Sequence, residues 1–174
     1  EISACLVGSE MCIRDREKED PASKAYYKTF SSAMQRIMTS YCQAGGNLFV
    51  SGAYVGSDMS GTQGNREFTE KILKYGYQGS LTDKSSNQIK GLGRTITIPR
   101  LPNESSYAVP AADCIVPVDT AFPVFTYAPG NQSAGIAYKG NYRTFVLGFP
   151  FESIQSEADR ATIMAGILGF FTQK

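Results

Sequence analysis

Hydrophobic residues recur at spacings of three and four between residues 22 and 44, which predicts an amphipathic helix. The predicted buried stripe consists of Tyr26, Tyr27, Phe30, Met34, Ile37, Met38 and Tyr41. Gly45 and Gly46 follow, and glycine readily takes the left-handed conformation that ends a helix. The apolar run NLFVSG comes next and has the length and composition of a buried strand. A helix that returns through glycines to a buried strand is typical of a parallel sheet.

Shorter elements follow along the chain. A second helix is predicted over residues 65–75, with Phe68, Ile72 and Leu73 facing inward. Residues 76–93 are polar and rich in Gly and Ser, which favours an exposed excursion. Strands are predicted at RTITIP, DCIVPV, VFTYA, AGIAYKG and YRTFVLGFP. The last two form a hairpin that turns at residues 139–141.

A final helix is predicted over residues 156–172, with Ser156 as its N-cap and Glu157 and Asp159 in the first turn. Together these elements predict an α/β fold: a three-layer, flavodoxin-like sandwich with a mostly parallel sheet, helices on both faces and a C-terminal β-hairpin. A doubly wound sheet normally opens on a strand, so we expect the domain to be incomplete at its N-terminus. The predicted core consists of Val50, Ile96, Ile136, Val146 and Leu147, covered by Phe30, Ile37, Ile167 and Phe171.

The composition limits the partners and the catalytic groups that this chain can have. The 174 residues carry a net charge of +1, which gives no support for a nucleic-acid or membrane partner. Histidine is absent, which removes the commonest general base and metal ligand. The four cysteines include no C-x-x-C pair, so we expect no metal and no cofactor. Cys42 and Cys114 are predicted to be buried free thiols.

Two loops follow predicted buried strands, where ligands of open α/β sheets bind. In the first, Gly52 to Gly56 form a G-x-x-x-G turn like a nucleophile elbow, with Tyr54 at its centre. Ser51 and Ser57 are candidate nucleophiles without a base nearby in sequence, or plain turn residues. Asp58 and Glu152 could bind a sugar hydroxyl or a cation, or could cap helices and carry solvated charge. Asp113 and Asp119 are interpreted as turn residues.

The stretches YCQAGGNLFVSGAYVGSDM and RTFVLGFPFESI carry a family resemblance. They resemble the type-1 glutamine amidotransferase-like fold, and more narrowly its trehalose-utilisation-like branch. The resemblance extends over residues 22–172 to a domain of large secreted Bacteroidetes proteins that are labelled xanthan lyase and carry a golvesin-type domain. Active members have G-x-C-x-G in the first loop and H-P-E in the second. Here Tyr54 stands at the cysteine position and Phe149 at the histidine position, while Glu152 lies one residue beyond the active spacing.

The opening segment CLVGSEMCIRDR, residues 5–16, has neither helical nor strand period. It resembles the translation of a sequencing adapter. We therefore divide the chain into a non-native segment, residues 1–16, and one amidotransferase-like domain, residues 17–174. The family resemblance implies a secreted, cell-surface or periplasmic location.

These residues lead to a main hypothesis and two alternatives. The main one is a catalytically silent binding or scaffold module that contacts a glycan and other domains of the same full-length protein. A polysaccharide lyase or hydrolase is the first alternative, with Tyr54 as a low-ranking candidate base. A structural spacer is the second. The main hypothesis expects Ser51, Tyr54, Ser57, Asp58 and Glu152 to form the binding residues around a shallow groove.

Overall fold

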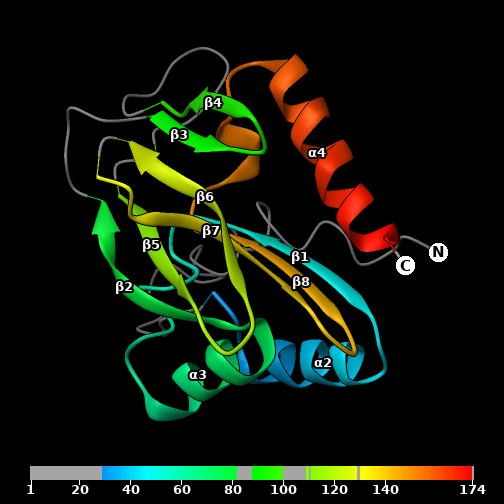
Figure 1. Cartoon of the computed structure of the whole chain (residues 1–174). Helices are drawn as coiled ribbons and strands as arrows, with labels where there is room; N and C mark the ends of the chain where they lie inside the picture. The colour runs from blue at the N-terminus through cyan, green and yellow to red at the C-terminus, as the bar shows by residue number, and fades with distance from the viewer. Residues whose placement is uncertain (1–28, 82–87, 100–108, 110, 129, 174) are drawn as a thin grey trace, which may run out of the picture.

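The computed structural model describes residues 29–81, 88–99, 109, 111–128 and 130–173 (Figure 1). Its elements, in chain order, are α2 (Ser32–Gln43), β1 (Asn47–Ser51), α3 (Gln63–Phe68), the π-helix η1 (Thr69–Leu73), β2 (Tyr75–Leu81), β3 (Gln88–Gly91), β4 (Arg94–Thr97), β5 (Ala112–Pro117), β6 (Phe122–Ala128), β7 (Ser133–Lys139), β8 (Arg143–Leu147), the 3-10 turn η2 (Phe151–Ser153) and α4 (Glu157–Thr172). The expected adapter-like segment and the first turns of the predicted helix at 22–44 lie outside these residues.

Six strands form one curled sheet in the order β1-β8-β7-β6-β3-β4. Strand β1 runs parallel to β8, and the other four pairs of this sheet are antiparallel. The antiparallel pairs β3–β4, β6–β7 and β7–β8 are joined by short turns, which suffice for antiparallel neighbours, whereas parallel neighbours need a long crossover. The curl gives this sheet the form of half a barrel (Figure 1).

A second, two-stranded sheet pairs β2 with β5 in antiparallel fashion. It is joined to the large sheet by backbone hydrogen bonds: Asp113 N–H donates to Gly148 O at 2.7 Å, and Gly148 N–H donates to Ala134 O at 2.8 Å. A Cβ at Gly148 would lie 2.1 Å from Asp113 O, so this junction requires glycine. Strand β5 is thus held against the end of β8.

The sheet buries a separate apolar cluster on each face. One cluster combines Ile163 and Ile167 of α4 with sheet residues such as Phe125 and Phe145. The other combines α2, α3 and η1 with Leu48, Val50, Ile136 and Val146. In Figure 1, α2 and α3 accordingly lie below the sheet, and α4 lies at the upper right.

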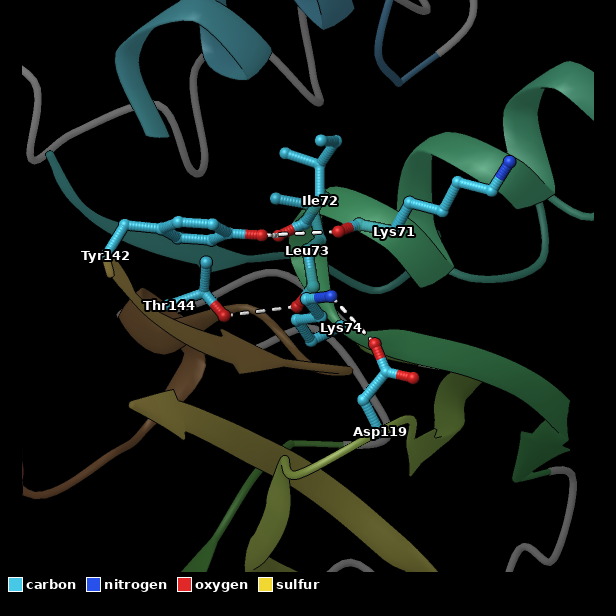
Figure 2. Close-up of polar contacts among 7 residues, drawn as sticks. All are labelled: Lys71, Ile72, Leu73, Lys74, Asp119, Tyr142 and Thr144. Atoms are coloured by element: carbon cyan, nitrogen blue, oxygen red, sulfur yellow. Dashed lines mark hydrogen bonds and ion pairs between the residues drawn. The ribbon is translucent and has the colours of Figure 1, made fainter. Parts of the chain in front are cut away.

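The π-helix η1 ends on polar side chains from the sheet (Figure 2). The hydroxyl of Tyr142 donates to the carbonyl oxygens of Lys71 at 3.2 Å and Ile72 at 2.9 Å, and Thr144 Oγ1 donates to Leu73 O at 3.1 Å. These bonds satisfy carbonyl groups that a helix end leaves without intrahelical partners. Lys74 then takes a left-handed φ of 67° and pairs with Asp119 Oδ2 at 2.7 Å.

The expected helix-rich, flavodoxin-like sandwich with a mostly parallel sheet is wrong. Within the described residues, one strand pair is parallel and the rest are antiparallel. The predicted exposed excursion at 76–93 is also wrong, because this stretch contributes β2 and β3. Their pairing partners, β5 and β6, lie far along the chain, so local polarity did not reveal these strands.

The predicted core is confirmed in most places. Val50, Ile96, Ile136, Val146 and Leu147 are all buried, as are Phe30 and Ile167, whereas Phe171 is half-buried. The helix stripe is wrong at two positions, since Ile37 is 67% exposed and Tyr41 is 39% exposed. Helix α2 turns Met38 and Cys42 to the sheet instead, which leaves Ile37 outward. The ring of Tyr41 covers Gly46, where a Cβ would come within 2.4 Å of it.

Candidate functional site

The loop after β1, residues 52–59, is the elbow-like turn that the sequence singles out. Val55 and Met59 are fully buried in the cluster beneath α2 and fasten the loop to the core. Two backbone bonds close it into turns, from Asp58 N–H to Tyr54 O at 3.3 Å and from Met59 N–H to Gly56 O at 3.2 Å. The phenol of Tyr75 donates to Val55 O at 2.6 Å. The loop is therefore held by both its apolar and its polar groups.

A buried carboxylate fixes the far side of this loop. Asp113 lies on β5 with no exposed surface, and its Oδ2 accepts bonds from Gly56 N–H at 2.8 Å and Ser57 N–H at 2.9 Å. The same oxygen accepts from Ser57 Oγ at 3.2 Å, and Oδ1 accepts from Ser80 Oγ at 2.9 Å. Burial raises the pKa of Asp113, and the hydrogen bonds from Ser57, Gly56 and Ser80 oppose that rise.

Asp113 is the residue that sequence reasoning misjudged. The sequence analysis predicts a turn residue, but Asp113 stands inside a strand whose neighbours Ala112, Cys114 and Ile115 are buried. An aspartate within an apolar strand must find donors, because an unpaired buried charge is very costly. The pattern A-D-C-I-V was the available signal. The related reading of Asp119 fits, since it lies in a turn with φ 57°.

The other predicted site residues engage different partners. Ser51 is buried and its Oγ accepts from Phe151 N–H at 3.4 Å, which ties β1 to the second loop. Asp58 Oδ2 accepts from Thr29 N–H at 2.7 Å and from Thr29 Oγ1 at 2.8 Å. Ser57 thus turns toward Asp113, whereas Asp58 turns toward the segment that precedes α2.

Two further predicted residues are half-buried. Tyr54 packs against the cluster that contains Phe149. Glu152 lies in the single turn η2, directly after Pro150. The structure joins the first loop to the second through Ser51, and a common groove for the predicted residues stays a prediction.

The position that resembles the histidine base holds a core side chain. Phe149 has no exposed surface and makes an edge-to-face contact with Phe125, with ring centroids 6.1 Å apart. A phenyl ring accepts no proton, so this position cannot activate a nucleophile. Both described cysteines are buried, and desolvation raises the pKa of Cys42 to about 11 and also raises that of Cys114. Neither thiol is an activated nucleophile.

A shallow groove of about 590 Å³ lies elsewhere, between α2 and the α3–η1 segment. Its polar lining includes Arg36, Thr39, Glu67 and Lys71, and Phe68 is one of its apolar lining residues. Lys71 is already paired with Glu67 at 3.1 Å. The sequence analysis did not identify this groove, because the residues that line its two helical walls carry no motif.

Among the described residues, no group of three or more Cys, Asp and Glu side chains could hold a metal ion. None of the helices in the described ranges is long and apolar enough to cross a membrane.

Comparison with known proteins gives the fold alone. No protein-family model and no curated protein matches the chain. Among solved structures, the GH42 β-galactosidase Gan42B aligns over 81% of this chain and 20% of its own, with a TM-score of 0.56 and 12% identity. A catalytic mutant of Gan42B from G. stearothermophilus has a TM-score of 0.57, with the same identity and coverage. The exo-β-1,4-mannosidase Op5Man5 from Opitutaceae bacterium strain TAV5 covers 82% of this chain and 23% of its own, with a TM-score of 0.50 and 11% identity. The chain spans about a fifth of the length of these enzymes.

Proposed function

We propose that this chain is a non-catalytic binding module of a larger, carbohydrate-associated protein. The observation that carries the proposal is the occupation of the elbow by Asp113. In a working elbow, the central residue is an exposed nucleophile and nearby backbone N–H groups stabilise an oxyanion. Here the N–H groups of Gly56 and Ser57 both donate to the Asp113 carboxylate, within 2.9 Å. An oxyanion at this place would have to displace a buried negative charge.

The remaining catalytic parts are also replaced. Tyr54 occupies the nucleophile position, and buried Phe149 occupies the position of the base. Ser57 could serve as a nucleophile only through Asp113, whose Oδ2 already accepts two backbone bonds in addition to the serine hydroxyl. A carboxylate so engaged is a weak base toward that hydroxyl.

Two observations support the carbohydrate association. The sequence resembles a domain of large secreted proteins that are labelled xanthan lyase. The fold also recurs as roughly a fifth of a β-galactosidase and of an exo-β-1,4-mannosidase. A chain of this size would then account for one part of such a protein, and the reaction would be performed by other parts. The family, the secreted location and the scaffold role belong to this proposal.

The proposal is tested by measuring turnover and binding side by side. We expect no product from glutamine, xanthan or peptidoglycan fragments, and retarded migration of the chain in native gels that contain a neutral polysaccharide. Product formation that disappears in Tyr54→Phe would overturn the proposal in favour of a lyase with Tyr54 as base. Free migration through every polysaccharide tested would overturn the binding role. Tyr41→Phe, which alters an exposed tyrosine on α2, is the matched control.

A further inference from the structure

Three hydroxyl groups gather over the buried carboxylate of Asp113, and we call Ser57, Ser80 and Tyr77 the hydroxyl cluster. Ser57 Oγ bonds Asp113 Oδ2 at 3.2 Å, and Ser80 Oγ bonds Oδ1 at 2.9 Å. The phenol oxygen of Tyr77 lies 2.8 Å from Ser80 Oγ. The two serines are partly exposed and Tyr77 is 37% exposed, so the cluster reaches the surface above a carboxylate that does not.

A β-bulge brings the cluster together. Tyr77 and Ser80 are three residues apart, so a regular strand would point them to opposite faces. The pairing of β2 with β5 shifts between Tyr77 and Gly79, where an extra residue enters the strand. Gly79 has a φ of 150°, in the region that favours glycine. The bulge places Ser80 opposite Asp113 while Tyr77 stays opposite Ile115, and bulges commonly re-aim a side chain in this way.

The ring of Tyr77 is seated on the elbow loop. A Cβ at Gly56 would lie 2.8 Å from the Tyr77 ring and 3.4 Å from Asp113 Oδ2, so the missing side chain of Gly56 makes room for both. Strand β2 and the elbow therefore meet at Asp113. Gly56 of the elbow lies 57 residues from Asp113 along the chain, and Ser80 of β2 lies 33 residues from it. The result is an aromatic ring beside two serine hydroxyls.

The carboxylate dictates the direction of each hydroxyl proton. An ionised carboxylate accepts hydrogen bonds and donates none, so Ser57 and Ser80 each direct their single proton to Asp113. Because the Ser80 proton is used, the Tyr77 hydroxyl is the donor in its bond to Ser80. All three protons point inward, and the remaining lone pairs of the three oxygens are acceptors. The negative charge beneath strengthens them as acceptors.

From this arrangement we propose that the hydroxyl cluster binds a neutral sugar residue, which donates adjacent hydroxyl protons to Ser57 and Tyr77 while its C–H face packs on the Tyr77 ring. This inference rests on the proposed function and names its site. A neutral sugar supplies the donors that the acceptors need and an apolar face for the aromatic ring. A uronate is excluded, since its carboxylate would face lone pairs above a buried negative charge.

The test is a titration of the ¹⁵N-labelled chain followed by NMR, with methyl β-D-galactoside as the probe. We expect the amide signals of Gly56 and Ser57 to shift on saturation. Losing one acceptor should weaken binding about tenfold, the value of a single hydrogen bond, in both Ser57→Ala and Tyr77→Phe. Tyr41→Phe should bind like the unaltered chain.

A second experiment changes the sugar and keeps the protein unaltered. The permethylated sugar keeps its ring and its acceptors but has no hydroxyl donor, and we expect it not to shift these signals. Equal binding of the permethylated sugar, or of the matching galacturonoside, would overturn the donor assignment. Sugar-induced shifts elsewhere, with unchanged affinity in the two cluster variants, would overturn this site and leave the proposed function standing. No shift with any sugar, at any position, would overturn both.

Discussion

Replacing Asp113 with asparagine tests whether the buried carboxylate holds the elbow in place. The amide has the same shape but accepts hydrogen bonds at one atom only. With its oxygen at the Oδ2 position, it still accepts from Gly56 and Ser57, and its NH₂ group then faces Ser80, whose hydroxyl must rotate to accept. The fold is therefore kept, and what changes is the charge of the acceptor.

The magnitude follows from the four bonds that Asp113 accepts. A bond to a charged group stabilises by about 1 kcal/mol more than a neutral one, so the loss is roughly 4 kcal/mol at most. Removal of the buried charge offsets this loss, because the pKa of Asp113 is raised, so desolvation of the carboxylate outweighs its hydrogen bonds. We therefore expect Asp113→Asn to change the unfolding free energy at pH 7 by less than about 1 kcal/mol. Asp113→Ala, which leaves two backbone N–H groups without an acceptor, should cost about 3–5 kcal/mol.

The assay is urea unfolding between pH 3 and pH 7, and the raised pKa of Asp113 fixes the direction in which the unfolding free energy changes with pH. Because the pKa of Asp113 is raised in the fold, the folded state binds its proton more tightly than the unfolded state does. Asp113 therefore lowers the unfolding free energy as the pH rises from its ordinary pKa of 3.8 through the raised value. Asp113→Asn should lack this decline.

The matched control is Asp119→Asn. Asp119 is 58% exposed and pairs with Lys74, so its loss should cost less than about 1 kcal/mol. An Asp113→Ala variant that is as stable as the unaltered chain, or an Asp113→Asn variant with the same pH dependence, would refute the role of Asp113 in holding the elbow. Faster amide exchange at Gly56 and Ser57 in Asp113→Ala would locate the loss at the elbow.

Three further predictions concern the framework. Tyr142→Phe removes the donor to the η1 carbonyls and should lower the unfolding free energy by about 0.5–1.5 kcal/mol in urea melts, and an unchanged midpoint would contradict the cap. Gly148→Ala should lower the unfolding free energy by about 3 kcal/mol or lower the yield of folded protein. Its control is Gly169→Ala on α4, where a Cβ meets nothing within 4 Å and should stabilise the fold by about 0.5–1 kcal/mol in thermal melts. Equal effects of the two substitutions would refute the close approach of β5 to Gly148. Burial raises the pKa of Cys42 from 9.0 to about 11, so the unfolding free energy should fall as pH rises through this range, by up to roughly 2–3 kcal/mol, and Cys42→Ala should remove that decline.

The sequence by itself determined the local elements. Ser156 caps α4 by accepting from Asp159 N–H, Gly45 ends α2 with a φ of 88°, and the hairpin β7–β8 turns where glycine was expected. Burial of Val50 and Val146 followed from their apolar strands. These features depend on neighbours a few residues away, and such interactions are visible in the order of residues along the chain.

Tertiary structure alone decided the strand directions and the site. An apolar run such as residues 143–147 has the same composition in a parallel or an antiparallel pair, so the sequence predicted the β7–β8 hairpin but could not say that the other edge of β8 pairs in parallel with β1. Ser57 was identified as a candidate, but its partner Asp113 lies 56 residues away, and Ser80 faces that carboxylate through the bulge at Gly79. Each of these contacts depends on strand pairing between distant segments, and it is the burial of both sheet faces that selects that pairing.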